Sequence, residues 1–177
     1  MKAFLLISIL IFYASTLPAQ KKSSKNKIAV PVPDTTKTIQ ATESPIKSLS
    51  TAEYDAYQNA DPMGLTTIAE INNYPSPSSV LALAGQLRLS VVQKSQISAV
   101  QEALRFKAKE MGRFIIQNEK KFNDLFATGK VNDGTLIYYT NQYGLYQGEL
   151  RNAHLQAHLK VRRILTPDQL KKITQLK

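Results

Sequence analysis

Two histidines, His154 and His158, are the residues whose type and spacing could bind a ligand through nitrogen. They lie four positions apart, so on a helix both side chains project from one side, as a helical pair of metal ligands requires. At about 100° per residue, His154 falls inside the apolar stripe of its predicted helix and His158 falls at the edge of that stripe. The alternative interpretation is a pair of packed, hydrogen-bonded histidines that flanks the core.

A metal site would need at least one more ligand, which must come from another helix or another subunit. The carboxylates and the thioether available for this role in principle are Glu102, Glu110, Met111 and Glu119. The sequence gives no reason to prefer one of them. The divalent metals considered for such a donor set are zinc, copper and nickel.

No catalytic group of residues accompanies the two histidines. Cysteine is absent, which excludes disulfides, thiolate metal sites and cysteine nucleophiles together. No glycine-rich phosphate loop, serine–histidine–acid set or pair of catalytic carboxylates stands out in the sequence. We therefore expect that the protein is not an enzyme and requires no cofactor.

The chain is strongly basic, with 23 Lys and Arg residues against 13 Asp and Glu residues in a length of 177. This length is enough for one ordinary domain and a tail. A net charge of +10 at pH 7 favours acidic partners, which include nucleic acid, anionic lipid and acidic unfolded chains. Composition alone does not choose among them.

The N-terminus predicts export. Residues 1–19 combine one lysine, an apolar run and a small-residue end, which is the layout of a secretory signal peptide cleaved after Ala19. The alternative is an uncleaved membrane anchor, although the apolar run is too short for a spanning helix. We expect a periplasmic protein, and this location counts against nucleic acid as the natural partner.

The rest of the chain divides into a linker and one domain. Residues 20–47 are rich in Lys, Ser, Thr and Pro and show no lasting periodicity, so we expect a disordered linker. Residues 48–177 are expected to form an all-α domain, a long antiparallel helical hairpin with shorter flanking helices. The short helices are expected over 50–59, over 65–71 and after the loop 74–77, the last capped by Ser78 or Ser79.

The hairpin is predicted by two long amphipathic segments whose apolar residues recur at intervals of three and four. The first runs to about Phe126, and the second carries its stripe from Leu136 to Ile164 after a glycine-containing turn with a possible Asp133 cap. Gly144 and Gly148 either weaken the second helix or let another helix approach it closely. The first stripe consists of Ile97, Val100, Leu104, Met111, Ile115, Phe122 and Leu125.

Related five-residue motifs precede the first long helix and follow the second, as LSVVQ and LTPDQ. In each motif the hydroxyl residue can cap the amide three positions on, and the glutamine there can reach back, which is a capping box. The second box also has proline at the first helical position and starts a final helix with Leu170, Ile173 and Leu176 turned inward. The motif residues are Leu89, Ser90, Gln93, Leu165, Thr166 and Gln169.

Some apolar residues lie off these stripes, namely Phe106, Ile116, Leu155 and Leu159. They are expected to be buried by a partner subunit or to remain exposed as a surface that binds clients. Arg113 and Arg162 would add positive charge to such a surface. The alternative is that these are ordinary scattered residues on solvated faces.

The two motifs at hairpin spacing, together with the export signal, resemble the Spy/CpxP family of periplasmic proteins, which is named for a duplicated LTxxQ motif. The resemblance covers about residues 46–177 and includes the later run AHLQAHL. It also includes upstream residues that match the family, namely Met63-Gly64-Leu65, Ala69-Glu70, Asn72, Tyr74-Pro75, Pro77 and Val80-Leu81. It implies a helical cradle, often an antiparallel homodimer, that holds unfolded or misfolded envelope proteins without ATP. A signalling partner in the envelope is also implied.

Relatives in the same family are described as periplasmic heavy-metal sensors or resistance proteins, so the resemblance also implies a metal-binding alternative centred on His154 and His158. The chain departs from the family pattern at three positions. Ser90 replaces the threonine of the first motif, and Ser79 and Ala82 stand where related sequences often have a histidine and a glutamate. The chaperone-like function is therefore the preferred hypothesis.

Overall fold

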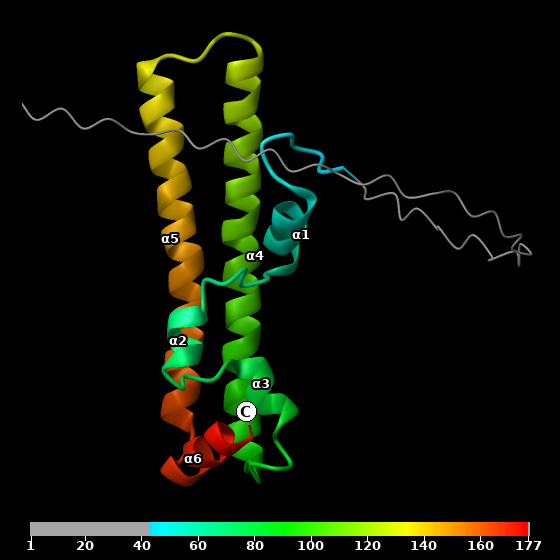
Figure 1. The fold of residues 1–177 in the computed structure, drawn as a ribbon, viewed down its shortest axis with the longest axis vertical. Helices are drawn as coiled ribbons and strands as arrows, with labels where there is room; N and C mark the ends of the chain where they lie inside the picture. Colours follow the sequence, from blue (N-terminus) through cyan, green and yellow to red (C-terminus); the bar gives the residue numbers. More distant parts are fainter. Residues whose placement is uncertain (1–42, 177) are drawn as a thin grey trace, which may run out of the picture. The chain divides into compact units, whose positions relative to one another are not determined.

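The computed structural model describes residues 43–176 (Figure 1). The predicted signal peptide, residues 1–19, and the predicted linker as far as residue 42 lie outside the described residues. Ile46, which the sequence places in the linker, is buried together with Leu49 against the first long helix. The packed part of the chain therefore includes these two residues.

The described residues form an all-α fold, as the sequence predicts, in which two long helices pack along each other as a hairpin. The long helices contain 37 and 32 residues. At about 1.5 Å per residue they are roughly 55 and 48 Å long. The helices are α1 (Thr51–Asn59), α2 (Thr67–Ile71), α3 (Pro77–Ala82), α4 (Val91–Ala127), α5 (Asp133–Ile164) and α6 (Pro167–Gln175).

Both predicted capping boxes form, and their glutamines also bind each other. The Ser90 hydroxyl accepts from the Gln93 amide before α4, and the Thr166 hydroxyl accepts from the Gln169 amide before α6. Gln93 Nε2 donates to Gln169 Oε1 over 2.9 Å, and Gln169 Nε2 donates to Gln93 Oε1 over 3.1 Å. Two sequence motifs 76 positions apart are therefore joined as one structure.

Two helix starts differ from the prediction. The cap of α3 is Ser76, not Ser78 or Ser79, because Pro77 fits the first helical position and moves the cap one residue upstream. The cap of α5 is Asn132, not Asp133. Asn132 has the extended backbone that an N-cap requires, whereas Asp133 is already helical.

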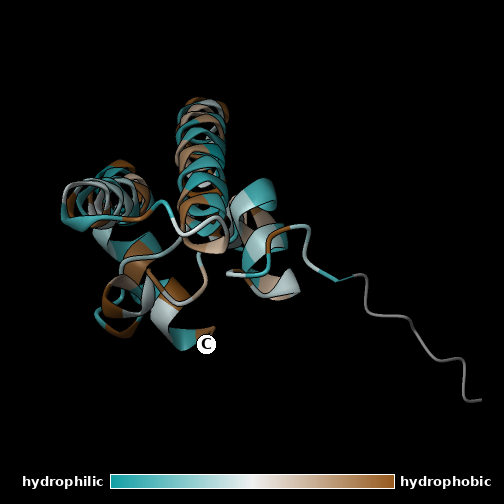
Figure 2. Ribbon diagram, turned by 90° about the horizontal axis from the view of Figure 1, so that it is seen from above, coloured by the Kyte–Doolittle hydropathy of each residue, from teal (hydrophilic) through white to brown (hydrophobic). Residues whose placement is uncertain are grey.

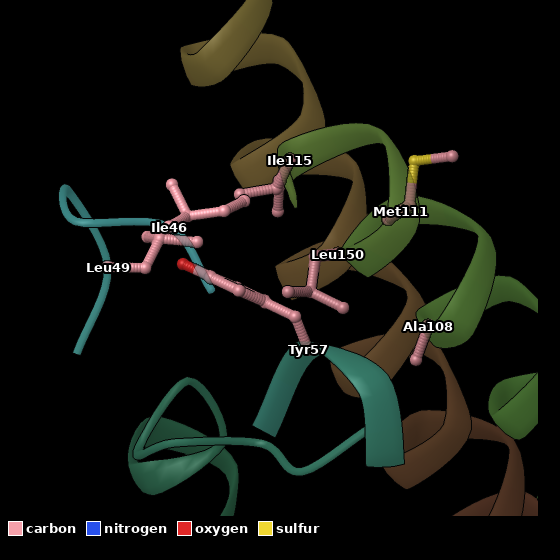
Figure 3. Close-up of a cluster of buried hydrophobic side chains, with 7 residues drawn as sticks. All are labelled: Ile46, Leu49, Tyr57, Ala108, Met111, Ile115 and Leu150. Carbon is pink, nitrogen blue, oxygen red and sulfur yellow. The ribbon is translucent and has the colours of Figure 1, made fainter. Parts of the chain in front are cut away.

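The main core lies where α1 and the chain before it pack on the middle of the hairpin (Figure 3). Tyr57 of α1 packs in a cluster with residues of both long helices, and Gln147 of α5 donates to its hydroxyl and to that of Tyr143. Burial raises the pKa of Tyr57. The cluster consists of Ile46, Leu49, Tyr57, Ala108, Met111, Ile115 and Leu150.

One glycine sets the distance between α1 and α4. A Cβ atom on Gly112 would lie 2.8 Å from the carbonyl carbon of Tyr57 and closer still to its oxygen, so α1 rests directly on the glycine backbone. Of the two alternatives considered for Gly144 and Gly148, the close approach of another helix does not occur within the described residues. Among the described residues, nothing lies within 4 Å of a Cβ atom at either position.

A second apolar cluster closes the end of the hairpin where α3 and α6 pack. Seen along the hairpin, the shorter helices gather around one side of α4 and α5, with apolar and polar residues alternating around each helix (Figure 2). Ile173 of α6 is buried as expected, but Leu176 is largely exposed because the helix ends at Gln175. No helix within residues 43–176 has the length and apolarity needed to cross a membrane.

Candidate functional site

His154 and His158 lie on the buried side of α5, with 3% and 2% of their surface exposed. They line a pocket of about 270 Å³, hereafter the histidine pocket, whose walls also come from the segment 59–78 and from α4. The polar side chains around it include Thr66, Glu70, Gln101 and Arg105. The four-residue spacing of the histidines therefore does place both rings at one site.

His158 binds the loop that precedes α3. Its Nδ1 lies 2.8 Å from the carbonyl oxygen of Tyr74. Because a carbonyl only accepts, Nδ1 must carry the hydrogen, which leaves the lone pair of a neutral ring on Nε2. Arg162, one turn further along α5, donates to the Asn73 carbonyl over 3.0 Å and lies 4.5 Å from the centroid of the Tyr74 ring. Two residues of α5 thus hold this loop over the histidine pocket.

His154 has a different environment, because its Nε2 is buried and has no hydrogen-bond partner among the described residues. Leaving such a nitrogen unpaired costs about 1–3 kcal/mol. Burial lowers the pKa of His154, the neighbouring His158 lowers it further, and Asp61 opposes both effects. The ring is therefore neutral at pH 7 and presents an unused polar atom at the histidine pocket.

The unfolding free energy should fall as the pH drops below about 6.5, the ordinary pKa of histidine, because the unfolded chain then takes up a proton that folded His154 resists. The charged or titratable groups around it are His158 on α5, Asp61, Glu70 of α2 and Arg105 of α4. His154→Gln should flatten this pH dependence in urea unfolding series at successive pH values. An equally steep dependence in the variant would show that another group is responsible.

Of the residues considered from the sequence as metal ligands, only the two imidazoles line the histidine pocket. Within residues 43–176 no group of three or more His, Cys, Asp or Glu side chains is placed to hold a metal. The four additional ligands considered from the sequence do not line the histidine pocket. Glu102 pairs with Arg105 and Glu110 with Lys107, while Met111 lies in the main core.

The six predicted client-binding residues do not form one surface. Phe106 and Arg113 are exposed on the outer face of α4, whereas Ile116 is half-buried against the main core. Leu155 and Leu159 line a separate groove with Ile68 and Tyr74, and Arg162 is engaged with the loop before α3. Arg113 also lies 5.5 Å from the centroid of the Phe114 ring.

Sequence reasoning missed the partners that complete this site. The Tyr74 carbonyl and the Thr66 and Glu70 side chains come from a short segment whose path over α5 has no periodic signal. The run Tyr74-Pro75-Ser76-Pro77 does indicate a stiff, extended loop, because each proline restricts the residue before it. That signal alone would not place the loop beside His158.

Comparison of the chain with protein-family models, with curated proteins and with solved structures gave no match. The structure itself defines an all-helical hairpin whose histidine pocket is lined by α4, α5 and the segment 59–78. The resemblance to the Spy/CpxP family rests on the motif residues themselves.

Proposed function

We propose that this protein is a periplasmic, ATP-independent chaperone or envelope-stress adaptor that holds unfolded proteins on the outer face of α4. The observation that carries this proposal is Phe106, a large aromatic residue with 75% of its surface exposed in the middle of a long helix. Arg105, Lys109 and Arg113 lie around it on the same face together with Glu102 and Glu110, and we call Phe106 and the three basic residues the Phe106 patch. Family resemblance supports the same function.

The Phe106 patch combines two weak attractions. Glu102 pairs with Arg105, but Lys109 and Arg113 form no ion pair within the described residues. An exposed ring beside free cations suits unfolded chains that expose apolar residues and carry negative charge. Neither attraction is strong enough alone to retain a folded protein, so binding would favour unfolded clients. A homodimer could enlarge this surface. A signalling partner in the envelope would respond to the binding of clients at the Phe106 patch.

The chain from Gln20 should suppress light scattering by insulin that aggregates when its disulfides are reduced by dithiothreitol. The reductant does not affect the protein itself, since it has no cysteine. Phe106→Gln should weaken the suppression several-fold, whereas Leu145→Gln, a matched change at another exposed apolar residue, should not. Arg113→Gln should act in the same direction, with Arg151→Gln as its control. Equal losses in both members of each pair would contradict a localised surface.

A metal-binding sensor or resistance protein is the second candidate, favoured by the unpaired Nε2 of His154 in the pocket that His158 also lines. The same scattering experiment separates the two functions when it is repeated with EDTA and with His154→Ala/His158→Ala. Suppression that survives both changes supports the chaperone. A loss in both, together with zinc, copper or nickel binding by the unaltered chain in a titration, supports the metal-binding function.

A further inference from the structure

The end of the hairpin opposite the turn 128–132 differs in charge from the rest of the fold. This basal end consists of residues 87–94, which lead into α4, and residues 160–176, which contain the last turn of α5 and all of α6 (Figure 1). The Gln93–Gln169 pair and the donation from Gln169 Nε2 to the Leu87 carbonyl over 3.3 Å tie the two segments together. The basal end is therefore one continuous part of the molecule.

The net positive charge of the described residues comes entirely from the basal end. Residues 43–176 contain sixteen Lys and Arg residues and twelve Asp and Glu residues, an excess of four positive charges. Seven of the sixteen and only one of the twelve, Asp168, belong to the basal end. The basal end alone thus has an excess of six positive charges, and the remainder of the fold has an excess of two negative charges.

The basic side chains of the basal end are available to a partner. Arg162 is engaged with the loop before α3, but the others are exposed and form no ion pair within the described residues. These exposed residues are Arg88, Lys94, Lys160, Arg163, Lys171 and Lys172. Six free cations on one end of a rod would attract a partner that presents many negative charges on one surface.

Exposed apolar side chains occur among these cations. Val91 and Val92, at the start of α4, have 84% and 64% of their surface exposed, and Leu176 after α6 has 44%. The opposite end also has exposed apolar residues, including Phe126 and Ile137. There, however, residues 119–133 contain three basic and three acidic side chains, so that end has no net charge.

We propose that the basal end is a docking surface for an anionic lipid bilayer. An anionic bilayer presents negative headgroups above an apolar layer, and each Lys or Arg near such a surface contributes about 1 kcal/mol. Val91, Val92 and Leu176 would enter the boundary between headgroups and acyl chains. A hydrated acidic polymer would engage the cations but would gain nothing from the valines. This docking surface is independent of the proposed client-holding function.

The test is flotation of the chain from Gln20 with vesicles of phosphatidylcholine alone and of an equal mixture with phosphatidylglycerol. Binding is expected only to the mixture. Arg163→Gln/Lys171→Gln/Lys172→Gln should weaken the partition coefficient on the order of 100-fold, since three contributions of about 1 kcal/mol are lost. The control Lys109→Gln/Arg113→Gln/Arg151→Gln removes the same charge from the middle of the hairpin and should have a much smaller effect. Equal losses in the two variants would overturn the proposal.

A second variant separates a bilayer from an acidic polymer. Val91→Gln/Val92→Gln keeps the charge and should reduce binding to the mixed vesicles, most clearly at high salt, where screening weakens the electrostatic contribution. Circular dichroism would verify that every variant keeps its helices. Unchanged vesicle binding in the valine variant, with equally tight binding of soluble polyphosphate, would replace the bilayer by an acidic polymer. Client holding should persist in the basal variants, so this proposal and the proposed function can fail separately.

Discussion

Gly112→Ala should lower the free energy of unfolding by about 1–3 kcal/mol, the range for overpacking a closely packed contact. The added methyl would meet the carbonyl group of Tyr57, which is backbone and cannot rotate away. To make room, α1 must move off α4, and Tyr57 must then withdraw from the cluster between the two long helices. The loss should appear in urea unfolding followed by circular dichroism.

Gly144→Ala is the matched control for this variant, and its effect should have the opposite sign. Gly144 lies inside α5, and among the described residues nothing is near enough to meet the added methyl group. Alanine restricts the unfolded chain and favours the helix, so it should stabilise the fold by about 0.5–1 kcal/mol. If both variants shift stability in the same direction, α1 does not rest on Gly112 in solution.

Gln93→Glu should destabilise the fold by about 2–4 kcal/mol, because two part-buried acceptors lose their donor and a buried acceptor without a partner costs about 1–3 kcal/mol. As an isolated cap the change would be harmless, since glutamate and glutamine both serve in capping boxes. Here, however, Gln93 Nε2 donates to the Ile164 carbonyl and to Gln169 Oε1. A carboxylate can make neither bond and places negative charge against both oxygens. Urea unfolding at pH 7 measures the loss.

Glu53→Gln in the capping box of α1 is the control, because the side-chain hydrogen bonds of Glu53 among those described all go to Ser50. This exchange of glutamate for glutamine, the reverse of Gln93→Glu, should change the free energy of unfolding by less than about 0.5 kcal/mol, as is usual for exposed positions. Gln93→Glu should also recover part of its stability in acid, where a protonated carboxyl can donate again. A Gln93→Glu variant as stable as the parent would show that the two glutamines act only as separate caps.

The elements predicted correctly are those whose signals are local. Both capping boxes are complete within four consecutive residues, and the stripes of α4 and α5 repeat for many turns, so no distant contact is needed to predict them. The two misplaced caps are errors of one to three residues, which arise where several polar residues adjoin. Asn132 and Asp133 are both residue types that suit an N-cap, and the fold alone decides which of them adopts the extended conformation.

The features that sequence reasoning could not predict depend on packing between distant segments. Gly112, Gly144 and Gly148 are alike as glycines within helices, and only the position of α1 makes the first one critical. The glutamines of the two motifs were expected to cap their own helices, but their mutual pairing requires the hairpin to close first. Likewise, spacing placed His154 and His158 on one side, whereas the loop over them was found only in the fold.

Apart from Asn132, which caps α5, the turn 128–132 takes part in none of the structural features described above. No residue of it belongs to either apolar cluster, to the histidine pocket or to the basal end. The hairpin can therefore grow or shrink at this end during evolution, provided that α4 and α5 gain or lose turns in equal number. For the same reason, a fluorescent protein or an affinity tag inserted at Gly129 would sit where the fold tolerates it best. The length of the hairpin can vary at this turn, whereas the basal end is constrained by contacts such as the Gln93–Gln169 pair.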